Sequence, residues 1–401
     1  MSSGQWYVII IRTNTLATRQ KAGIEMGGKE KYLEADKLRA SGDYKKALEL
    51  YTKLAEEGCA VSQCALGDMY SSGRGVEQNY DEALKWYRLS ASQDNREAQY
   101  WLGYMHEEGL GVDVDIVEAL KWYEKSAENG YAIAQGDLGL RYFEGHDVEI
   151  DYQKARYWFE KAVDNGESII SAYYLGEIYY HGLGCQRDME KAVKNYTISA
   201  NFGNREAEYI LGNLHAQGKI IAQNLTTAVK WYRLSAEKGH QGAEYWLGYM
   251  FEHGYGTPKD LVESAKWYQK SANHGNKDAY FRLGQMYEFG IGVDMDLNKA
   301  YQNYETSAYL GHHAGQYACG RMHYHGIGVE KDSIKAFEYF LKSAEQGNGY
   351  AEKQVGNMYW YGIGVEQDKQ LAEQFLRKAH NNEKYESLTY YKHWKDLIDK
   401  K

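Results

Sequence analysis

The chain has 401 residues, of which 47 are Lys or Arg and 56 are Asp or Glu, so its formal net charge at pH 7 is −9. Hydrophobic residues make up 43% and charged residues 26% of the chain, a balance that is ordinary for a folded, water-soluble protein and unlike that of a disordered one. Basic and acidic residues are interleaved along the whole length, and the excess of negative charge argues against a partner with a phosphate backbone, such as a nucleic acid.

Residues 1–28 are predicted to be a disordered N-terminal leader. Their apolar run, residues 6–11, is shorter than the segment of about 7 to 15 apolar residues found in a secretory signal peptide, and no positive charge precedes it. The alternative interpretation is that residues 6–11 form a partner-binding strand.

Residues 29–58 are predicted to be a pair of helices. At their centre, residues 42–51 read Gly-Asp-Tyr-Lys-Lys-Ala-Leu-Glu-Leu-Tyr, which is similar to a tetratricopeptide unit. This resemblance implies an N-terminal capping pair.

A fixed period occupies residues 59–380. A glycine, preceded by Leu in seven of nine cases, recurs at intervals of 36 residues, with one interval of 37. A second glycine follows six residues later in every copy, and a third glycine usually follows after two more. Self-similarity at such a period indicates a repeat architecture, and we predict nine units. The repeat glycines, as we call the first of these, are Gly67, Gly103, Gly139, Gly176, Gly212, Gly248, Gly284, Gly320 and Gly356.

Each feature of the repeat has a physical reason. A glycine inside a helix costs about 1 kcal/mol relative to Ala, so its recurrence predicts a neighbouring helix too close for a Cβ atom. The glycine six residues later suits a left-handed helix C-cap. A small residue, usually Ala, precedes Trp, Tyr or Phe by three positions in most copies, which predicts interlocking helix faces. One unit is therefore helix A, a glycine turn and helix B.

These residues resemble a known family. Residues 97–112 read Glu-Ala-Gln-Tyr-Trp-Leu-Gly-Tyr-Met-His-Glu-Glu-Gly-Leu-Gly-Val, and residues 118–130 read Glu-Ala-Leu-Lys-Trp-Tyr-Glu-Lys-Ser-Ala-Glu-Asn-Gly. Both segments look like Sel1-like repeats, which are relatives of the tetratricopeptide repeat. The predicted fold is all-α: a right-handed α-solenoid of about nine 36-residue helix-turn-helix repeats with helical caps. Residues 381–401 carry apolar side chains at helical spacing and are predicted to be the C-terminal capping helix.

A second level of similarity lies above the repeat. Residues 86–91 recur at 231–236, and residues 100–105 recur at 245–250, both at an offset of 145 residues, or four repeats. We infer that a block of four repeats was duplicated, and we expect two similar sub-sites if the concave face of the solenoid binds a ligand.

The sequence offers no set of residues suited to catalysis. His323 and His325 lie two apart, which on a helix points them to different sides. The Gly-x-Gly turns follow helices, not strands, so they do not indicate a phosphate-binding loop. The four Cys have no regular spacing, which favours reduced thiols and a cytoplasmic location. We therefore expect no enzyme activity, no metal and no cofactor, and no run reaches the roughly 20 apolar residues of a membrane span.

Two sets of helix A positions are candidates for a concave binding surface. The position three before the repeat glycine is a nearly continuous aromatic stripe; packing between helices is the favoured interpretation of this stripe. The position one after the repeat glycine varies and is the better candidate for specificity, because stacking does not dictate it. Aromatic and Arg side chains dominate protein interfaces. The predicted partner-binding residues are Tyr100, Trp101, Tyr104, Tyr173, Glu177, Tyr209, Tyr245, Trp246, Tyr249, Phe281, Arg282, Tyr317 and Arg321.

The sequence thus predicts a non-catalytic scaffold or adaptor that binds a peptide or partner domain in a concave groove. A self-associating structural repeat protein, and hence a homo-oligomer, is the first alternative. A non-catalytic subunit of an enzyme complex is the second.

Overall fold

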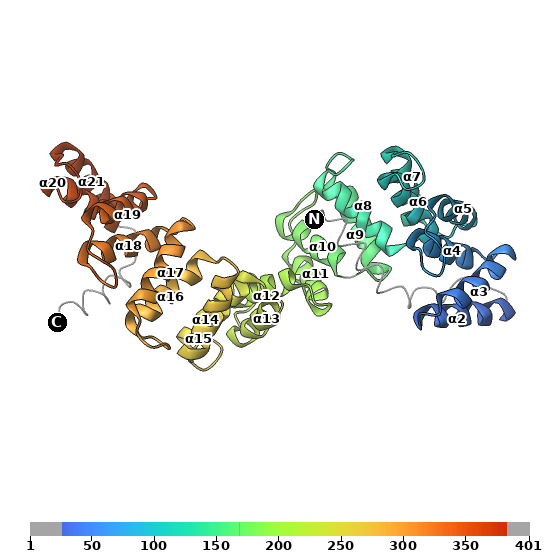
Figure 1. Ribbon diagram of the computed structural model, residues 1–401, viewed down its shortest axis with the longest axis horizontal. Helices are drawn as coiled ribbons and strands as arrows, with labels where there is room; N and C mark the ends of the chain where they lie inside the picture. Colours follow the sequence, from blue (N-terminus) through green and yellow to red (C-terminus); the bar gives the residue numbers. More distant parts are fainter. Residues whose placement is uncertain (1–25, 168, 383–401) are drawn as a thin grey trace. The chain divides into compact units, whose positions relative to one another are not determined.

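The computed structural model describes residues 26–167 and 169–382, and these residues form 20 helices and no strand (Figure 1). The predicted all-α solenoid of helix pairs is confirmed. Most of the predicted leader and nearly all of the predicted closing helix lie outside the described residues. The first helix, α2 (Met26–Ala40), begins three residues before the predicted boundary at residue 29, and α3 (Tyr44–Glu56) completes the pair ahead of the repeats.

Each of the nine repeats supplies one helix A and one helix B. The A helices are α4 (Ala60–Ser72), α6 (Arg96–Glu108), α8 (Ala132–Glu144), α10 (Ile170–His181), α12 (Arg205–Gln217), α14 (Gln241–His253), α16 (Lys277–Phe289), α18 (His313–His325) and α20 (Gly349–Tyr361). The B helices are α5 (Tyr80–Ala91), α7 (Ile116–Glu128), α9 (Tyr152–Asp164), α11 (Met189–Asn201), α13 (Leu225–Glu237), α15 (Leu261–Asn273), α17 (Leu297–Tyr309), α19 (Ser333–Glu345) and α21 (Lys369–Asn382).

The helix ends follow from local chemistry. The glycine six residues after the repeat glycine ends helix A in the left-handed conformation, as predicted; at Gly109, for example, φ is 67°. Helix B then begins at an Asn or Asp whose side chain accepts hydrogen bonds from the first turn, such as Asp115 from the Glu118 backbone N–H at 2.9 Å. The longer interval falls before α10, where the Glu167 carboxylate caps the helix by accepting from the Ser171 N–H at 2.8 Å.

In eight of the nine repeats the repeat glycine faces an aromatic ring of helix B, and in the ninth Gly356 faces Leu376. A Cβ atom on Gly67 would lie 2.5 Å from the ring of Tyr87, and the same clash recurs along the chain. The predicted close approach is confirmed, but the ring involved lies four residues after the repeat alanine, not three. The aromatic residues at the third position, such as Trp86, are mostly half-buried, because it is the fourth position that faces helix A. The buried rings are Tyr87, Tyr123, Phe159, Tyr196, Tyr232, Tyr268, Tyr304 and Phe340.

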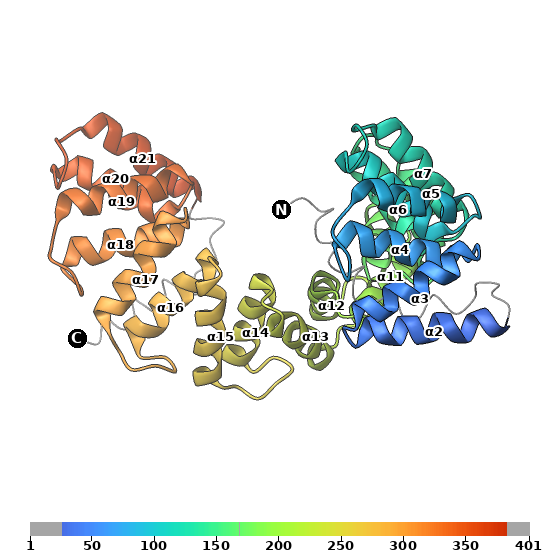
Figure 2. The ribbon, with the colours of Figure 1, turned by 45° about the vertical axis from the view of Figure 1, so that its right-hand side comes forward.

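The chain divides into two compact parts, residues 1–204 and 205–401. Within each part, every helix A packs on the helix B of its own repeat, and that helix B contacts the helix A that follows. Figure 2 shows α18 to α21 as two successive pairs of this kind. Among the described residues, no helix is long and apolar enough to cross a bilayer.

Candidate protein-binding surface

The aromatic stripe on the A helices packs against the buried rings of the B helices. Tyr100 lies 5.1 Å from Tyr123 between ring centroids, and the equivalent pairs in other repeats lie 5.5 to 6.2 Å apart. Tyr100 and Tyr317 are buried. The other predicted members are half-buried: Tyr173, Tyr209, Tyr245 and Phe281. These contacts agree with the interpretation that the stripe holds the helix pairs together.

The buried tyrosine hydroxyls need acceptors, and helix A supplies them at one of two positions. In the first, fourth and fifth repeats the acceptor is one residue after the repeat glycine. There the Tyr196 hydroxyl donates to Glu177 at 2.6 Å, and Tyr232 donates to Asn213 at 2.8 Å; Tyr87 likewise donates to Asp68. Glu177, predicted as a contact residue, therefore has this structural role.

In the second, sixth and seventh repeats the acceptor moves to four residues after the repeat glycine. Tyr123 donates to Glu107 at 2.6 Å, and Tyr268 donates to Glu252 at 2.7 Å. The third repeat has Phe159 in place of the tyrosine, and both acceptor positions are then apolar. Because the glutamate four residues after the repeat glycine accepts the hydrogen bond, the residue directly after that glycine does not have to be an acceptor. In α6 and α14 this residue is a tyrosine.

Arginine side chains bind these shifted glutamates from the following repeat. Arg141 lies 2.7 and 2.8 Å from the two carboxylate oxygens of Glu107 and also pairs with Asp137 and Asp147. Burial raises the pKa of Asp137, and the charge of Arg141 opposes this rise. Both hydrogen bonds come from one guanidinium nitrogen, Nη2. Hydrogen bonds between charged groups are stronger than neutral ones, so Arg141 joins the second repeat to the third.

Two of the predicted contact arginines belong to the same kind of network. Arg321 is 3% exposed and lies 2.5 and 2.7 Å from the carboxylate oxygens of Glu288. Burial acts to lower the pKa of Arg282, but Tyr268 and the Glu252 carboxylate outweigh it and raise that pKa. Arg321 therefore lies inside the repeat stack and not on its surface, and Arg282 is half-buried beside its own glutamate.

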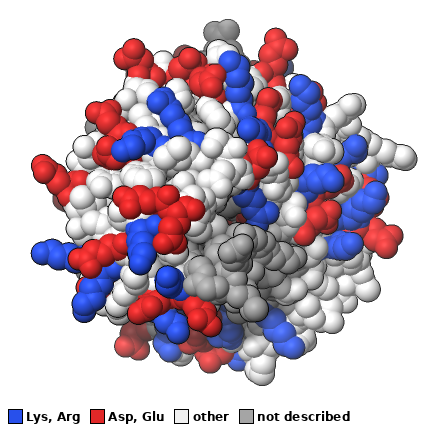
Figure 3. Space-filling view, turned by 90° about the vertical axis from the view of Figure 1, so that its right-hand side faces the viewer, with Lys and Arg blue, Asp and Glu red and all other residues white. Residues whose placement is uncertain are grey.

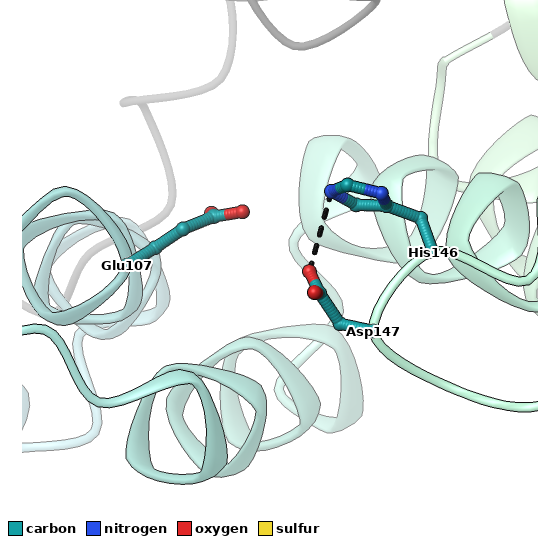
Figure 4. Close-up of side chains that lie close together, drawn as sticks. All are labelled: Glu107, His146 and Asp147. Carbon is teal, nitrogen blue, oxygen red and sulfur yellow. Dashed lines mark ion pairs between the residues drawn. The ribbon is translucent and has the colours of Figure 1, made fainter.

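Figure 4 shows the one group of three potential metal ligands among the described residues: Glu107, His146 and Asp147. Their ligand atoms lie within 4.8 Å of one another. However, Glu107 and Asp147 both bind the Arg141 guanidinium, at 2.7 and 2.9 Å, and His146 is exposed. A cation would have to displace a buried guanidinium, so the group fits an ion-pair network better than a metal centre.

A matching Trp-Tyr pair lies on α6 and on α14. On α6 the rings of Trp101 and Tyr104 meet edge to face, with centroids 5.7 Å apart and planes at 89°. On α14 the rings of Trp246 and Tyr249 do the same at 5.5 Å and 80°. Of the nine repeats, only the second and sixth carry Trp two residues before the repeat glycine and Tyr one residue after it. These four side chains are half-buried to exposed, and we call them the α6 pair and the α14 pair.

The surroundings of the two pairs differ. The α6 pair borders a pocket of about 380 Å³ whose lining includes the carboxylates of Asp68 and Glu97. The equivalent positions beside the α14 pair are Asn213 and Gly242, which carry no charge. Instead, Tyr249 adjoins two further rings, with centroid distances of 4.1 Å to His253 and 6.0 Å to Tyr255.

These features define a class of protein: an α-solenoid of short helix pairs that presents aromatic side chains on one set of helices. The family model for the Sel1 repeat matches ten segments of the chain, and the chain belongs to this family. The first matched segment, residues 32–59, corresponds to the helix pair α2–α3, so the family model adds one repeat to the nine seen by periodicity. The segments are 32–59, 60–95, 96–131, 132–167, 169–204, 205–240, 242–276, 277–312, 313–348 and 349–381.

Two solved structures are similar to this chain. A protective antigen of uropathogenic Escherichia coli strains with an SLR fold is 32% identical, with a TM-score of 0.78, over 90% of this chain and 80% of that one. A Sel1 repeat protein from Oxalobacter formigenes is 29% identical, with a TM-score of 0.59, over 79% of this chain and 90% of that one. No curated protein matches the chain. Sel1 repeat proteins are generally scaffolds for protein interactions.

Proposed function

We propose that this chain is a non-catalytic adaptor that binds a peptide segment of a partner protein at the α6 pair and at the α14 pair. The observation that carries the proposal is the pairing itself. The same Trp and Tyr recur four repeats apart with nearly the same ring geometry, at positions that the repeat does not require. Large, partly exposed aromatic rings are the side chains that most often dominate binding energy at protein interfaces.

The shift of the hydroxyl acceptor supports this interpretation. In α6 and α14 a glutamate one turn further on, Glu107 or Glu252, accepts from the buried tyrosine. The residue next to the repeat glycine can then be chosen for its surface and not for the core. Tyr104 and Tyr249 occupy this position in the two helices.

The charge distribution favours a protein partner over a nucleic acid. Figure 3 shows Lys and Arg interspersed with Asp and Glu on the face it presents, without a broad positive patch. A nucleic-acid backbone requires a concentration of positive charge, whereas aromatic side chains amid mixed charges suit a peptide. We place this activity in the cytosol, where the four thiols stay reduced.

A peptide-display selection on the immobilised chain tests the proposal. Peptides enriched by the wild type are measured against the double variants Trp101→Ala/Tyr104→Ala and Trp246→Ala/Tyr249→Ala. We expect each double variant to lose binding at one of two sites, and the quadruple variant to lose at least tenfold in affinity, the equivalent of about 1.4 kcal/mol.

The matched control is Tyr309→Ala, which removes an aromatic ring that is 90% exposed at the last residue of α17. It is expected to leave binding unchanged. Enriched peptides that bind the quadruple variant as tightly as the wild type would show that the two pairs are not the binding surface.

Self-association is the second candidate function. Self-association was predicted from the aromatic residues of the C-terminal segment 385–401. This segment lies outside the described residues. Light scattering over a range of protein concentrations tests self-association. A molar mass that rises with concentration for the full chain, but stays constant for a chain ending at residue 384, would favour self-association over the adaptor.

A further inference from the structure

The net negative charge of the chain belongs to one of its two parts. Residues 1–204 include 23 basic and 32 acidic residues, a net charge of −9, whereas residues 205–401 include 24 of each. An ion pair within one part contains one charge of each sign, so pairing inside a part leaves this difference unchanged. The first part therefore has more carboxylates than its own basic side chains can balance.

Within the first part, much of this excess lies on the A helices. α4, α6, α8 and α10 together carry seven acidic residues, two Arg and no Lys. In contrast, α5, α7, α9 and α11 carry eight acidic and nine basic residues. Both arginines of the A helices bind within the repeat stack: Arg96 donates to the Gly130 carbonyl at 2.7 Å, and buried Arg141 binds Glu107. The unbalanced charge thus lies on the set of helices that carries the α6 pair.

The α6 pair lies between two carboxylates on one face of its helix. Glu97, Trp101, Tyr104 and Glu108 follow one another at spacings of four, three and four residues, which places them along one helix face. Glu108 is exposed, and Glu97 is half-buried and lines the neighbouring pocket. That pocket also holds two guanidinium groups. The acidic character therefore belongs to the face of α6 and to the first part as a whole, and not to the pocket lining.

The α14 pair has no such flanking carboxylates. The residues equivalent to Glu97 and Glu108 are Gly242 and His253. Of the seven acidic positions on the A helices of the first part, only one has an acidic counterpart four repeats later. The corresponding helices α12, α14, α16 and α18 carry six acidic residues at other or equivalent positions, and three of these six are buried. The two surfaces therefore keep the same rings and differ in charge.

Exposed aromatic rings between carboxylates suit a positively charged side chain. A Lys or Arg side chain is attracted both to the ring face of Trp or Tyr and to a nearby carboxylate. The first kind of contact already occurs within the chain, where the Lys85 ammonium lies 5.4 Å from the centre of the Trp86 ring. At longer range, an excess of negative charge speeds the association of a basic partner and disfavours an acidic one.

We propose that the α6 pair binds a basic segment of a partner protein, in which Lys or Arg residues flank an apolar anchor, and that the α14 pair lacks this preference. The anchor packs against Trp101 and Tyr104, and the basic side chains lie beside Glu97 and Glu108. This inference rests on the proposed function and adds to it the chemical class of the partner. A neutral or acidic segment is the competing occupant.

Two single-site chains test the preference. Full-length Trp246→Ala/Tyr249→Ala keeps the α6 pair alone, and full-length Trp101→Ala/Tyr104→Ala keeps the α14 pair alone. Peptides are selected on each from the same random library. Lys and Arg are expected to be enriched only in the peptides selected by the α6 pair. Resynthesis of these peptides with Gln in place of every Lys and Arg should weaken binding at least tenfold at low salt, and by less at high salt.

Two charge variants of the otherwise wild-type chain locate the effect without removing any ring. Glu108→Gln/Glu144→Gln removes two exposed carboxylates from A helices, and Glu124→Gln/Glu128→Gln removes two from the B helix α7. Both variants change the net charge of the chain equally. A selected basic peptide is expected to bind the first variant about threefold more weakly than the wild type, because the lost charges adjoin the site. It should bind the second variant as it binds the wild type.

A gain of preference completes the test. His253→Glu, in the chain that keeps the α14 pair alone, places a carboxylate at the position of Glu108, and peptides selected on it should become enriched in Lys and Arg. Peptides of the α6 pair without a basic excess, or equal affinity for the two charge variants, overturn this inference and leave the adaptor standing. A selection that enriches no peptide on the wild type or on either single-site chain contradicts the adaptor itself, and this inference with it.

Discussion

The α6 pair and the α14 pair are two copies of one motif in different settings. Their rings keep the same edge-to-face arrangement, at 5.7 and 5.5 Å. The neighbouring residues have changed: charged side chains of both signs line the pocket beside the α6 pair, whereas the rings of His253 and Tyr255 adjoin Tyr249 of the α14 pair. The residues equivalent to Asp68 and Glu97 are the neutral Asn213 and Gly242. The two repeats therefore keep the residues that fix the geometry of the Trp-Tyr pair. They differ in the adjoining residues, which determine the chemistry of a ligand that the pair can bind.

The supports beneath the two pairs also differ in strength. Below the α6 pair, Arg141 contacts three carboxylates and lies 4.9 Å above the ring of Tyr123. Below the α14 pair, Arg282 is half-buried and donates hydrogen bonds to Gln285 of its own helix, at 3.2 Å, and to Tyr245. We therefore expect the second repeat to depend on its arginine more than the sixth repeat does.

The largest effect is expected from Arg141→Ala. Removing one member of a buried ion pair costs about 3 to 5 kcal/mol, because the remaining charges stay buried without compensation. The expected loss is about 3 kcal/mol, since Glu107 and Asp137 keep some contact with water. Hydrogen exchange across α6 and α8 measures this loss locally.

Two variants serve for comparison. Arg282→Ala should lose less stability than Arg141→Ala, and Lys125→Ala, in an exposed pair, should lose under about 0.5 kcal/mol. Equal losses at Arg141 and Lys125 would contradict the comparison.

The next effect concerns the glycines beneath the two pairs. A Cβ atom on Gly103 would lie 2.8 Å from the buried ring of Tyr123, and one on Gly248 would lie 2.9 Å from Tyr268. Overpacking of this kind costs about 1 to 3 kcal/mol, and the higher helix propensity of Ala returns about 1 kcal/mol. The difference between these two terms is a destabilisation of up to about 2 kcal/mol for each of Gly103→Ala and Gly248→Ala, measured by urea denaturation. Exposed Glu108→Ala is the control, and a stabilised glycine variant would refute the close approach.

A third effect, of comparable size, tests the rule for hydroxyl acceptors. Phe159→Tyr places a hydroxyl opposite Leu140 and Phe143, neither of which can accept a hydrogen bond. The expected loss is about 1 to 3 kcal/mol. Adding Leu140→Asn copies the arrangement of Tyr232 and Asn213 and should recover most of this loss. Denaturation of the single and double variants measures both terms, and a double variant no more stable than Phe159→Tyr would break the rule.

The sequence was sufficient for the helix pairs because each repeat carries its own signals. The repeat glycine, the C-cap glycine at positions such as Gly109 and the regular spacing repeat nine times, and local chemistry explains each of them. The period also located the α6 pair and the α14 pair, since a duplication of four repeats is visible without coordinates.

The rest depended on partners in neighbouring repeats. Arg321 occupies a position that varies from repeat to repeat and so was predicted to be a contact residue. It is buried because Glu288, 33 residues earlier, receives it. The two acceptor positions can be seen in the sequence. Their role can be recognised only when the structure shows that the aromatic ring four residues after the repeat alanine faces helix A. Periodicity shows which positions vary and not which of them meet across a repeat boundary.

The smallest predicted effect distinguishes the N-caps of α6 and α14. Asn95 caps α6, whereas His240 caps α14 by accepting from the Ala243 N–H at 3.1 Å while its other ring nitrogen bonds Glu206 at 2.9 Å. The hydrogen bond from His240 lowers the pKa of Glu206. A lowered carboxyl pKa adds stability above the ordinary value of about 4.3, and this stability is lost as the pH falls through the folded value.

His240→Asn keeps the cap but removes the bond to Glu206, so it gives α14 the cap of α6. The expected loss at pH 6 is under about 1 kcal/mol, because the Glu206 side chain is 45% exposed. Between about pH 5 and pH 3 the variant should lose less stability than the wild type, since its Glu206 titrates nearer the ordinary value. Denaturation at each pH and an NMR titration of Glu206 measure both effects. A Glu206 pKa that is the same in the variant and the wild type would show that the histidine caps α14 without coupling it to the preceding repeat.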